Sequence, residues 1–111
     1  MTADELERLK VELCCGMRIC HRRGAASPFI AGHASAKVSE TTFLANRFGT
    51  SFATVMPADM LLLDHDGNVL AGRGNVNQTI RLHGHIHRAC PDSHAVVHAH
   101  ADCVNTVGTL G

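Results

Sequence analysis

The first apolar positions of the chain recur at steps of three and four residues, the period of an amphipathic helix. They lie on one face of such a helix: Leu6, Leu9, Leu13, Met17 and Cys20. Thr2 and Glu5 have the three-residue spacing of a capping box, in which each side chain accepts a hydrogen bond from the other residue's backbone N–H. The pattern therefore predicts a helix over about residues 4–21.

After this helix, short apolar runs replace the helical period. Four of them have the length and composition of strands: residues 32–38, 41–45, 60–64 and 69–71. We expect the first two to pair as a hairpin around Ser39 and Glu40, and the last two to pair across a turn at Gly67. The loop between the hairpins, residues 46–57, is expected to end in a short helical turn near Pro57.

The last third of the chain returns to the helical period. Apolar positions from about residue 77 predict a helix that stops before Pro91, because proline removes a backbone donor and clashes with the preceding turn. Residues 95–97 predict a short buried strand, and a last helix is expected from about Ala101 to the end. This order of elements is typical of an α/β sandwich with a mixed or antiparallel sheet.

Composition narrows the classes of partner. Ten Lys and Arg residues balance ten Asp and Glu residues, and the sequence pI is about 7.1, so there is no excess charge to attract nucleic acid or an anionic membrane. No apolar run approaches the roughly 18 residues that a transmembrane helix needs. The five cysteines are odd in number and follow no recognisable secretory leader, which predicts a reduced, cytoplasmic chain.

Histidine is unusually frequent, with 9 among 111 residues. His98 and His100 are two residues apart, so on an extended chain their imidazoles point the same way and could bind one divalent cation. The alternative is that one is buried in the core and the other is exposed. His83 and His87, four apart on a predicted helix, form a second candidate pair, with packing and helix surface as the alternative.

Several short motifs follow one another along nearly the whole chain: Gly-His-Ala-Ser at 32–35, Phe-Gly at 48–49, Ala-Asp-Met-Leu-Leu-Leu-Asp at 58–64, Asp-Gly-Asn at 66–68, Leu-His at 82–83, Arg-Ala-Cys-Pro-Asp at 88–92 and Ala-Val-Val-His-Ala-His at 95–100. Together they resemble the class II aldolase and adducin family. The most specific element is the His-x-His step, which follows Pro-Asp and a run of small apolar residues.

This resemblance implies both a fold and an assembly. Members of the family form three-layer α/β/α sandwiches around a mainly antiparallel central sheet, and they are commonly homotetramers with active sites at subunit interfaces. We therefore expect residues 1–111 to form a single domain of this kind. Because the chain has about half the length of a full member, the domain is expected to be a fragment, truncated at its C-terminal end.

The resemblance also implies a metal. Enzymes of the family hold zinc or another divalent cation on three histidines, two of them from the His-x-His step. His98 and His100 match those two ligands, and the third is expected beyond Gly111. The expected cofactor is a divalent metal ion, with zinc preferred and manganese as the alternative.

Other positions depart from the pattern of the sugar-phosphate aldolases. Thr79 stands where those enzymes carry a glutamate that serves as acid and base, and a hydroxyl cannot accept and return a proton near neutral pH as a carboxylate can. The catalytic residue is therefore unassigned. Residues that usually grip substrate phosphate are also replaced, for example by His33 and Asn77. The chain is thus closer to the decarboxylase-like and uncharacterised branch.

By their positions in the resemblance, four residues are expected to bind substrate: His33, Ser35, Gly49 and Asn77. The alternative for Gly49 is turn geometry, and for Ser35 a strand hydroxyl. The expected function is a metal-dependent carbon–carbon lyase of aldolase or decarboxylase type, which acts on a small hydroxy- or keto-carbonyl or carboxylate substrate through a metal-stabilised enolate. The alternative is a non-catalytic adducin-like scaffold or an inactive fragment of such an enzyme.

Overall fold

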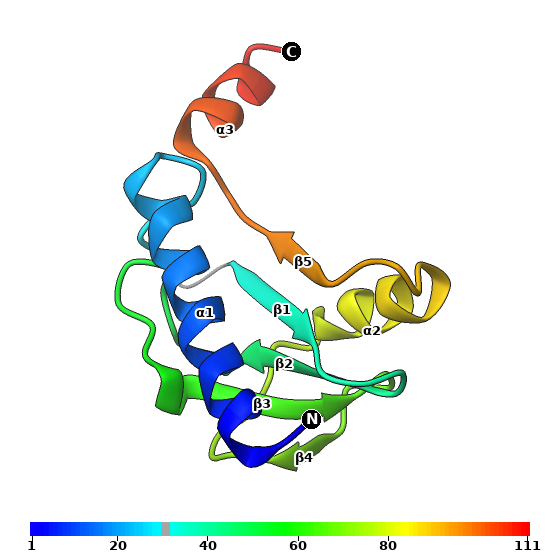
Figure 1. The fold of residues 1–111 in the computed structure, drawn as a ribbon. Coiled ribbons are helices and arrows are strands. Elements are labelled where there is room, and N and C mark those ends of the chain that lie inside the picture. Colours follow the sequence, from blue (N-terminus) through cyan, green and yellow to red (C-terminus); the bar gives the residue numbers. More distant parts are fainter. Residues whose placement is uncertain (30–31) are drawn as a thin grey trace.

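The structure, a computed structural model, describes residues 1–29 and 32–111. The elements of the described chain are shown in Figure 1 and run in this order: α1 (Ala3–Arg22), β1 (His33–Lys37), β2 (Thr42–Asn46), the 3-10 helix η1 (Pro57–Asp59), β3 (Met60–Asp64), β4 (Val69–Ala71), α2 (Ile80–Ala89), β5 (Ala95–His98) and α3 (Asp102–Thr109). Within the described residues, no helix combines the length and the apolar character needed to cross a membrane.

The strands form one sheet in the order β4-β3-β2-β1-β5. Every neighbouring pair is antiparallel, so the sheet is antiparallel rather than mixed. Both predicted hairpins are present. Strand β5, from late in the chain, pairs with β1 at the opposite end of the sheet from β4.

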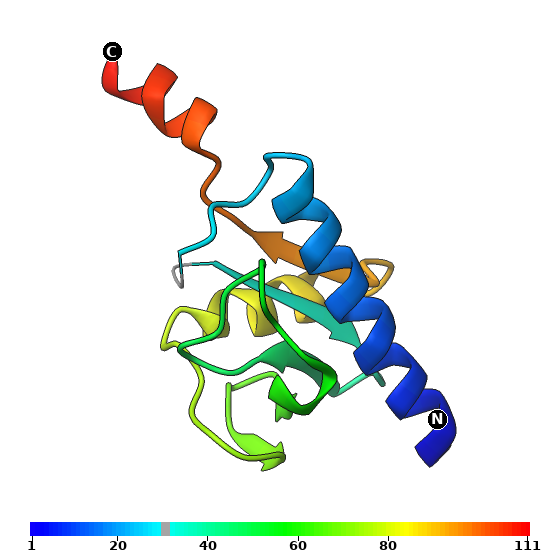
Figure 2. The same ribbon diagram turned by 90° about the vertical axis from the view of Figure 1, so that its left-hand side faces the viewer.

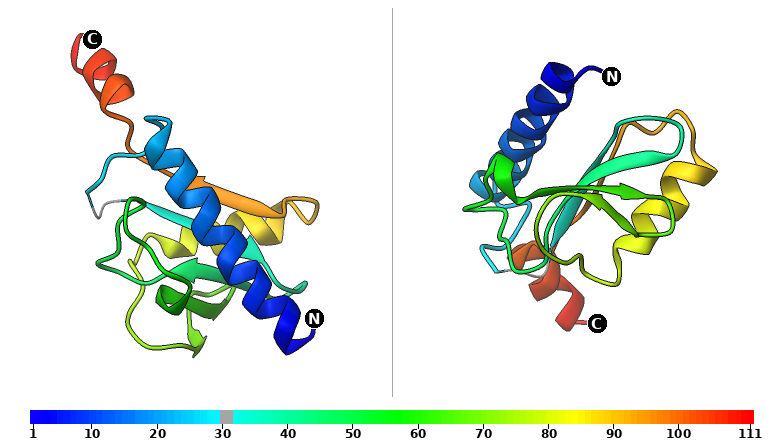
Figure 3. Two further views of the ribbon diagram at one scale, coloured as in Figure 1. Left: turned by 60° about the vertical axis from the view of Figure 1, so that its left-hand side comes forward. Right: turned by 90° about the horizontal axis from the view of Figure 1, so that it is seen from below.

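Helices α1 and α2 cover opposite faces of the sheet, which gives the three expected layers (Figures 2 and 3). Alternate residues of a strand face opposite sides. Accordingly, Ala34 and Leu44 join the apolar cluster that contains Met17 of α1, whereas Phe43 packs in the cluster of Ile80 of α2. Helix α3 projects away from the sheet (Figure 1).

Helix α1 extends one residue beyond its prediction at each end, and the predicted capping box is present. The Thr2 hydroxyl accepts the Glu5 N–H at 3.1 Å, and the Glu5 carboxylate accepts the Thr2 N–H at 2.6 Å. Helix α2, in contrast, begins three residues later than expected. Asn77 Oδ1 accepts the backbone N–H of Thr79 at 3.0 Å, and such a bond competes with helical hydrogen bonding, so the helix begins only after this turn.

Helix α2 comes very close to the turn between β3 and β4 at Gly84. A Cβ atom at this position would lie 2.0 Å from the carbonyl oxygen of His65 and 2.8 Å from its carbonyl carbon. Both are backbone atoms, which cannot move aside as the end of a flexible side chain can. The close packing of α2 on the sheet therefore requires glycine here.

Replacing Gly84 by alanine is expected to destabilise the fold by about 2 kcal/mol, because overpacking a tight site costs roughly 1–3 kcal/mol. Helix propensity alone predicts the opposite sign, since alanine is favoured over glycine by about 1 kcal/mol. The free energy of unfolding, from urea titration followed by circular dichroism, measures the outcome. Gly16→Ala in α1 is the matched control, because a Cβ atom there would meet nothing within 4 Å. Helix propensity alone then acts, so this variant is expected to be more stable than the parent chain. Equal changes in the free energy of unfolding in Gly84→Ala and Gly16→Ala would contradict the close approach of Gly84 to the His65 backbone.

Candidate functional site

The two candidate ligands of the His-x-His step lie at the end of β5. His98 is half-buried and His100 is exposed. Their Nε2 atoms are 3.1 Å apart, and their ring centroids are 5.0 Å apart. The two imidazoles therefore turn the same nitrogen atom toward each other, within hydrogen-bonding distance.

The register of β1 and β5 brings a third imidazole beside them. His33 is the cross-strand partner of His98, with the ring centroids 4.7 Å apart. Both nitrogens of His33 are already engaged, however: Nδ1 lies 2.6 Å from His83 Nε2, and Nε2 lies 2.7 Å from the Thr79 hydroxyl. Across residues 1–29 and 32–111, no group of three His, Cys, Asp or Glu side chains is arranged to hold a metal ion.

Helix α2 contributes two buried histidines one turn apart, His83 and His87. The hydroxyl of Ser35 on β1 lies 2.7 Å from His83 Nδ1 and 2.9 Å from His87 Nε2. The pair is thus bridged by a hydroxyl of the sheet, which corresponds to the packing alternative for these residues. Helical spacing places both rings on the face of α2 that meets the sheet.

Burial keeps these imidazoles neutral. Loss of hydration lowers the pKa of His83 from 6.5 to about 3 and the pKa of His33 from 6.5 to about 4. It also lowers the pKa of His87. Desolvation has this effect because it disfavours the charged form of the ring. At neutral pH each ring therefore donates through one nitrogen and accepts through the other.

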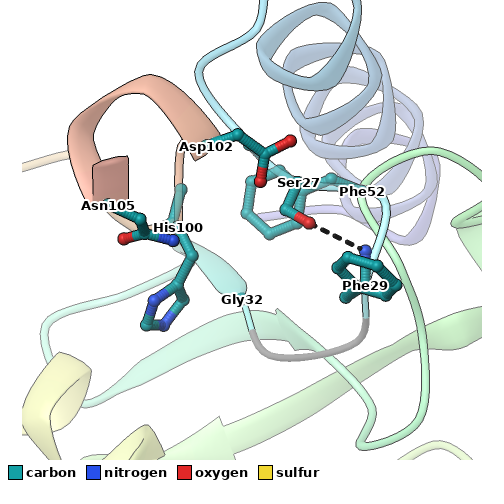
Figure 4. Close-up of a pocket in the computed structure, with 9 residues that line it drawn as sticks. Ser27, Phe29, Gly32, Phe52, His100, Asp102 and Asn105 are labelled. Carbon is teal, nitrogen blue, oxygen red and sulfur yellow. Dashed lines mark hydrogen bonds between the residues drawn. The ribbon is translucent and has the colours of Figure 1, made fainter. Parts of the chain in front are cut away.

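A cavity of about 280 Å³ lies next to His100. It is lined by Ala26, Ser27, Phe29, Gly32, Phe52, Ala99, His100, Asp102 and Asn105. Figure 4 shows His100 and Asn105 on one side of it and Phe29 on the other. The cavity thus combines polar groups from the end of the chain with apolar rings from earlier loops.

Gly32 is tightly packed at this cavity. A Cβ atom there would lie 2.9 Å from a ring carbon of Phe52 and 3.0 Å from the carbonyl oxygen of His98. A side chain at this position would push the aromatic wall and the candidate ligand strand apart. The glycine of the Gly-His-Ala-Ser motif therefore has a packing role at this site.

The four residues predicted to bind substrate lie in different surroundings. His33 and Ser35 are buried on β1, with exposed fractions of 2% and 0%. Asn77 is half-buried and caps the turn before α2, and Gly49 lies in an exposed loop with a φ of 88°. None of the four is among the residues that line the cavity beside His100. Their assignment to a substrate pocket stays a prediction.

Sequence reasoning missed the contributions of Ser27 and Asn105 to this cavity. Ser27 follows α1 in a loop, and Asn105 belongs to α3. Neither residue stands in a motif. They share the cavity only because the loop after α1 runs beside the segment after β5, where the Ser27 N–H donates to the His100 carbonyl oxygen at 2.8 Å.

The buried histidines predict a loss of stability in acid. Unfolded His83 binds a proton below a pKa of about 6.5, whereas the folded residue does so only near a pKa of about 3. The free energy of unfolding should therefore fall as the pH is lowered from about 6.5 toward 3, by about 1.4 kcal/mol per pH unit for each such histidine. Urea titrations at several pH values measure this slope. The dependence of the free energy of unfolding on pH should become shallower in His83→Gln. It should stay the same in His85→Gln, because His85 is exposed on the same helix and serves as the control. Identical slopes in the two variants would contradict the lowered pKa of buried His83.

The chain is similar to several known proteins. It is 32% identical over 110 residues to methylthioribulose-1-phosphate dehydratase of Methylococcus capsulatus, a match that covers 99% of this chain and 53% of that protein. A stretch of 61 residues is 39% identical to decarboxylase NovR of Streptomyces niveus and covers 53% of this chain and 23% of that protein. The chain thus spans only part of these relatives, about half of the dehydratase.

A solved structure confirms the fold class. L-fuculose 1-phosphate aldolase from Glaciozyma antarctica matches with a TM-score of 0.83 and 28% identity, over 100% of this chain and 48% of that one. The family model described as the class II aldolase and adducin N-terminal domain matches residues 11–111. The matched region includes all five strands and the His-x-His step. The chain belongs to the class II aldolase and adducin family.

Proposed function

We propose that this chain is the metal-binding part of a metal-dependent carbon–carbon lyase of aldolase or decarboxylase type. The proposal is carried by one observation: the Nε2 atoms of His98 and His100 converge to 3.1 Å. His100 also lines a cavity of about 280 Å³, which is large enough for a small hydroxy- or keto-carbonyl or carboxylate substrate. The relatives are named as a dehydratase, a decarboxylase and an aldolase, which are all lyases. The decarboxylase and the aldolase break carbon–carbon bonds, whereas a dehydratase breaks a carbon–oxygen bond.

The donor set fits a divalent metal such as zinc. Two nitrogens bound to one tetrahedral zinc ion at about 2.0–2.1 Å lie about 3.3 Å apart, close to the 3.1 Å between His98 and His100. Two ligands do not complete such a site. The remaining ligands are therefore proposed to come from outside the described residues, with zinc as the preferred ion and manganese as the alternative.

Each group at the site then has a distinct role. When bound, a divalent cation supplies Lewis acidity, which stabilises negative charge that develops beside a carbonyl group. His98 and His100 would hold it beside the cavity that His100 lines. The Asp102 carboxylate and the Asn105 amide would accept from and donate to substrate hydroxyl and carbonyl groups. Phe52 supplies an apolar wall that excludes water.

The cavity favours a substrate without a phosphate group. Among the described residues that line it, Asp102 is acidic and none is a lysine or an arginine. Those two residues are the usual partners of phosphate, and a phosphate here would instead meet a carboxylate of like charge. The lining of the cavity therefore supports a decarboxylase-like function over the cleavage of a sugar phosphate. A homotetrameric, cytoplasmic enzyme is part of the same proposal.

Metal binding tests the proposal directly. Titration of the metal-free chain with Zn²⁺ or Co²⁺, followed by calorimetry, should show one cation per chain. His98→Ala and His100→Ala should each weaken the affinity by about tenfold or more, which corresponds to about 1.4 kcal/mol, because each removes one nitrogen donor.

His85→Ala is the matched control, since His85 is exposed on α2 and should bind with unchanged affinity. If the double variant His98→Ala/His100→Ala binds as tightly as the parent chain, the assignment of ligands is wrong. If the parent chain and a longer form both lack saturable binding, the non-catalytic scaffold is the better description.

A further inference from the structure

Strand β5 is the edge of the sheet opposite β4 (Figure 1), and it pairs on one side only. In an antiparallel ladder, the backbone groups of alternate residues point toward opposite neighbours. The Lys37 N–H donates to the His94 carbonyl oxygen at 2.8 Å, so in this register the even-numbered residues of β5 bond to β1. The backbone groups of Ala95, Val97 and Ala99 therefore point outward, away from β1.

Val97 lies in the middle of this outer edge. Within the described residues, its N–H and C=O make no hydrogen bond, and its side chain is 55% exposed. The Ala95 carbonyl oxygen accepts from the Ser93 hydroxyl at 3.2 Å, which leaves the second lone pair of that oxygen free. An edge with free donors and acceptors is a template for the addition of another strand.

The face of β5 that looks toward α1 restricts which strand fits. Ala95 and Val97 line an apolar groove of about 320 Å³, and Leu13 and Met17 of α1 also line it. Cross-strand neighbours share one face of a sheet. An added strand must therefore place small apolar side chains at alternate positions on the α1 side. Strand β5 has this pattern itself, so the edge is complementary to a second copy of β5.

We propose that the outer edge of β5 is a dimer interface, to which β5 of a second copy of this chain adds in antiparallel orientation. The two-fold axis passes through Val97, because the free N–H and C=O of one Val97 can bond to those of the other. Ala95 then pairs with Ala99 of the partner subunit, and apolar side chains meet on the α1 side. The two grooves lie next to each other across the axis.

The same register brings a further imidazole to the candidate metal ligands. Pairing about Val97 places His94 of the partner subunit opposite His100, on the face that carries both candidate ligands. The Cβ atoms of directly opposed residues lie about 4.5–5.5 Å apart, so this exposed ring reaches the space beside His98 and His100. One of the ligands that a single chain lacks then comes from the second copy. This role of His94 rests on the proposed metal site, whereas the dimer itself does not.

Sedimentation equilibrium of the metal-free chain tests the dimer. The parent chain should sediment as a dimer, or as two such dimers joined together. Val97→Lys should weaken the association across β5 by about tenfold or more, because like charges would face each other at the axis. Val69→Lys is the matched control. It makes the same change at an exposed valine on β4, the opposite edge of the sheet, and should leave the association unchanged.

The position of the axis makes a sharper prediction. Val97→Glu should associate as weakly as Val97→Lys, but an equimolar mixture of the two variants should form a heterodimer, because opposite charges then face each other. Misfolding of either variant cannot produce this rescue. A monomeric parent chain, full association of Val97→Lys, or a mixture that stays monomeric although both variants are folded by circular dichroism would each overturn the interface.

Another occupant of the edge would give a different result. If the oligomeric state of a longer form of the chain does not change in Val97→Lys, a later segment of the same chain covers β5, and a second copy is overturned as the occupant.

Titration with Zn²⁺ tests the role of His94. His94→Ala should remain dimeric and bind the cation about tenfold more weakly, whereas His85→Ala should bind it as the parent chain does. Equal affinity in His94→Ala and the parent chain would overturn the contribution of the second copy to the site. The dimer is measured without metal, so it can form even if His98 and His100 bind no cation. Conversely, those two ligands can bind a cation in a chain that stays monomeric.

Discussion

The contact between Gly84 and the backbone of His65 is the constraint on which the rest of the buried structure depends. Because no side chain stands between them, α2 lies close enough to the sheet for His83 and His87 to reach Ser35 on β1. If α2 lay farther from the sheet by the width of one methyl group, the hydrogen bonds from His83 and His87 to Ser35 would become longer. Interiors are close-packed, so a gap of this size would not be filled without wider rearrangement.

This closeness produces a polar centre in an otherwise apolar layer. Phe43 and its neighbours make the α2 face of the sheet hydrophobic, whereas β1 presents His33 and Ser35 on the same face. Burying unpaired imidazoles would cost free energy. Here each ring is bonded to the next group, and the connected network holds the orientation of every ring. His33 is thereby held against His98, the point at which the buried network meets the candidate metal ligands.

Much of the fold could be predicted from the sequence, because most elements are set by local patterns. The capping box at Thr2 and the apolar spacing predicted α1 to within one residue at each end, and the run at residues 60–64 coincides with β3. The start of α2 was predicted too early, since the Asn77 side chain binds the backbone ahead of it. Ordered motifs along the whole chain identified the family, which no single element could have done.

For the candidate site, the sequence by itself predicted that His98 and His100 lie close together, as their 3.1 Å separation shows. Side chains two residues apart on an extended chain share one side, whatever surrounds them. Only the tertiary structure decided how the other histidines are used. His33 and His83 are 50 residues apart in the chain, and they meet because strand order and the contact at Gly84 bring β1 and α2 together. Hydrogen bonds over such separations depend on packing in three dimensions, which a pattern along one chain does not specify.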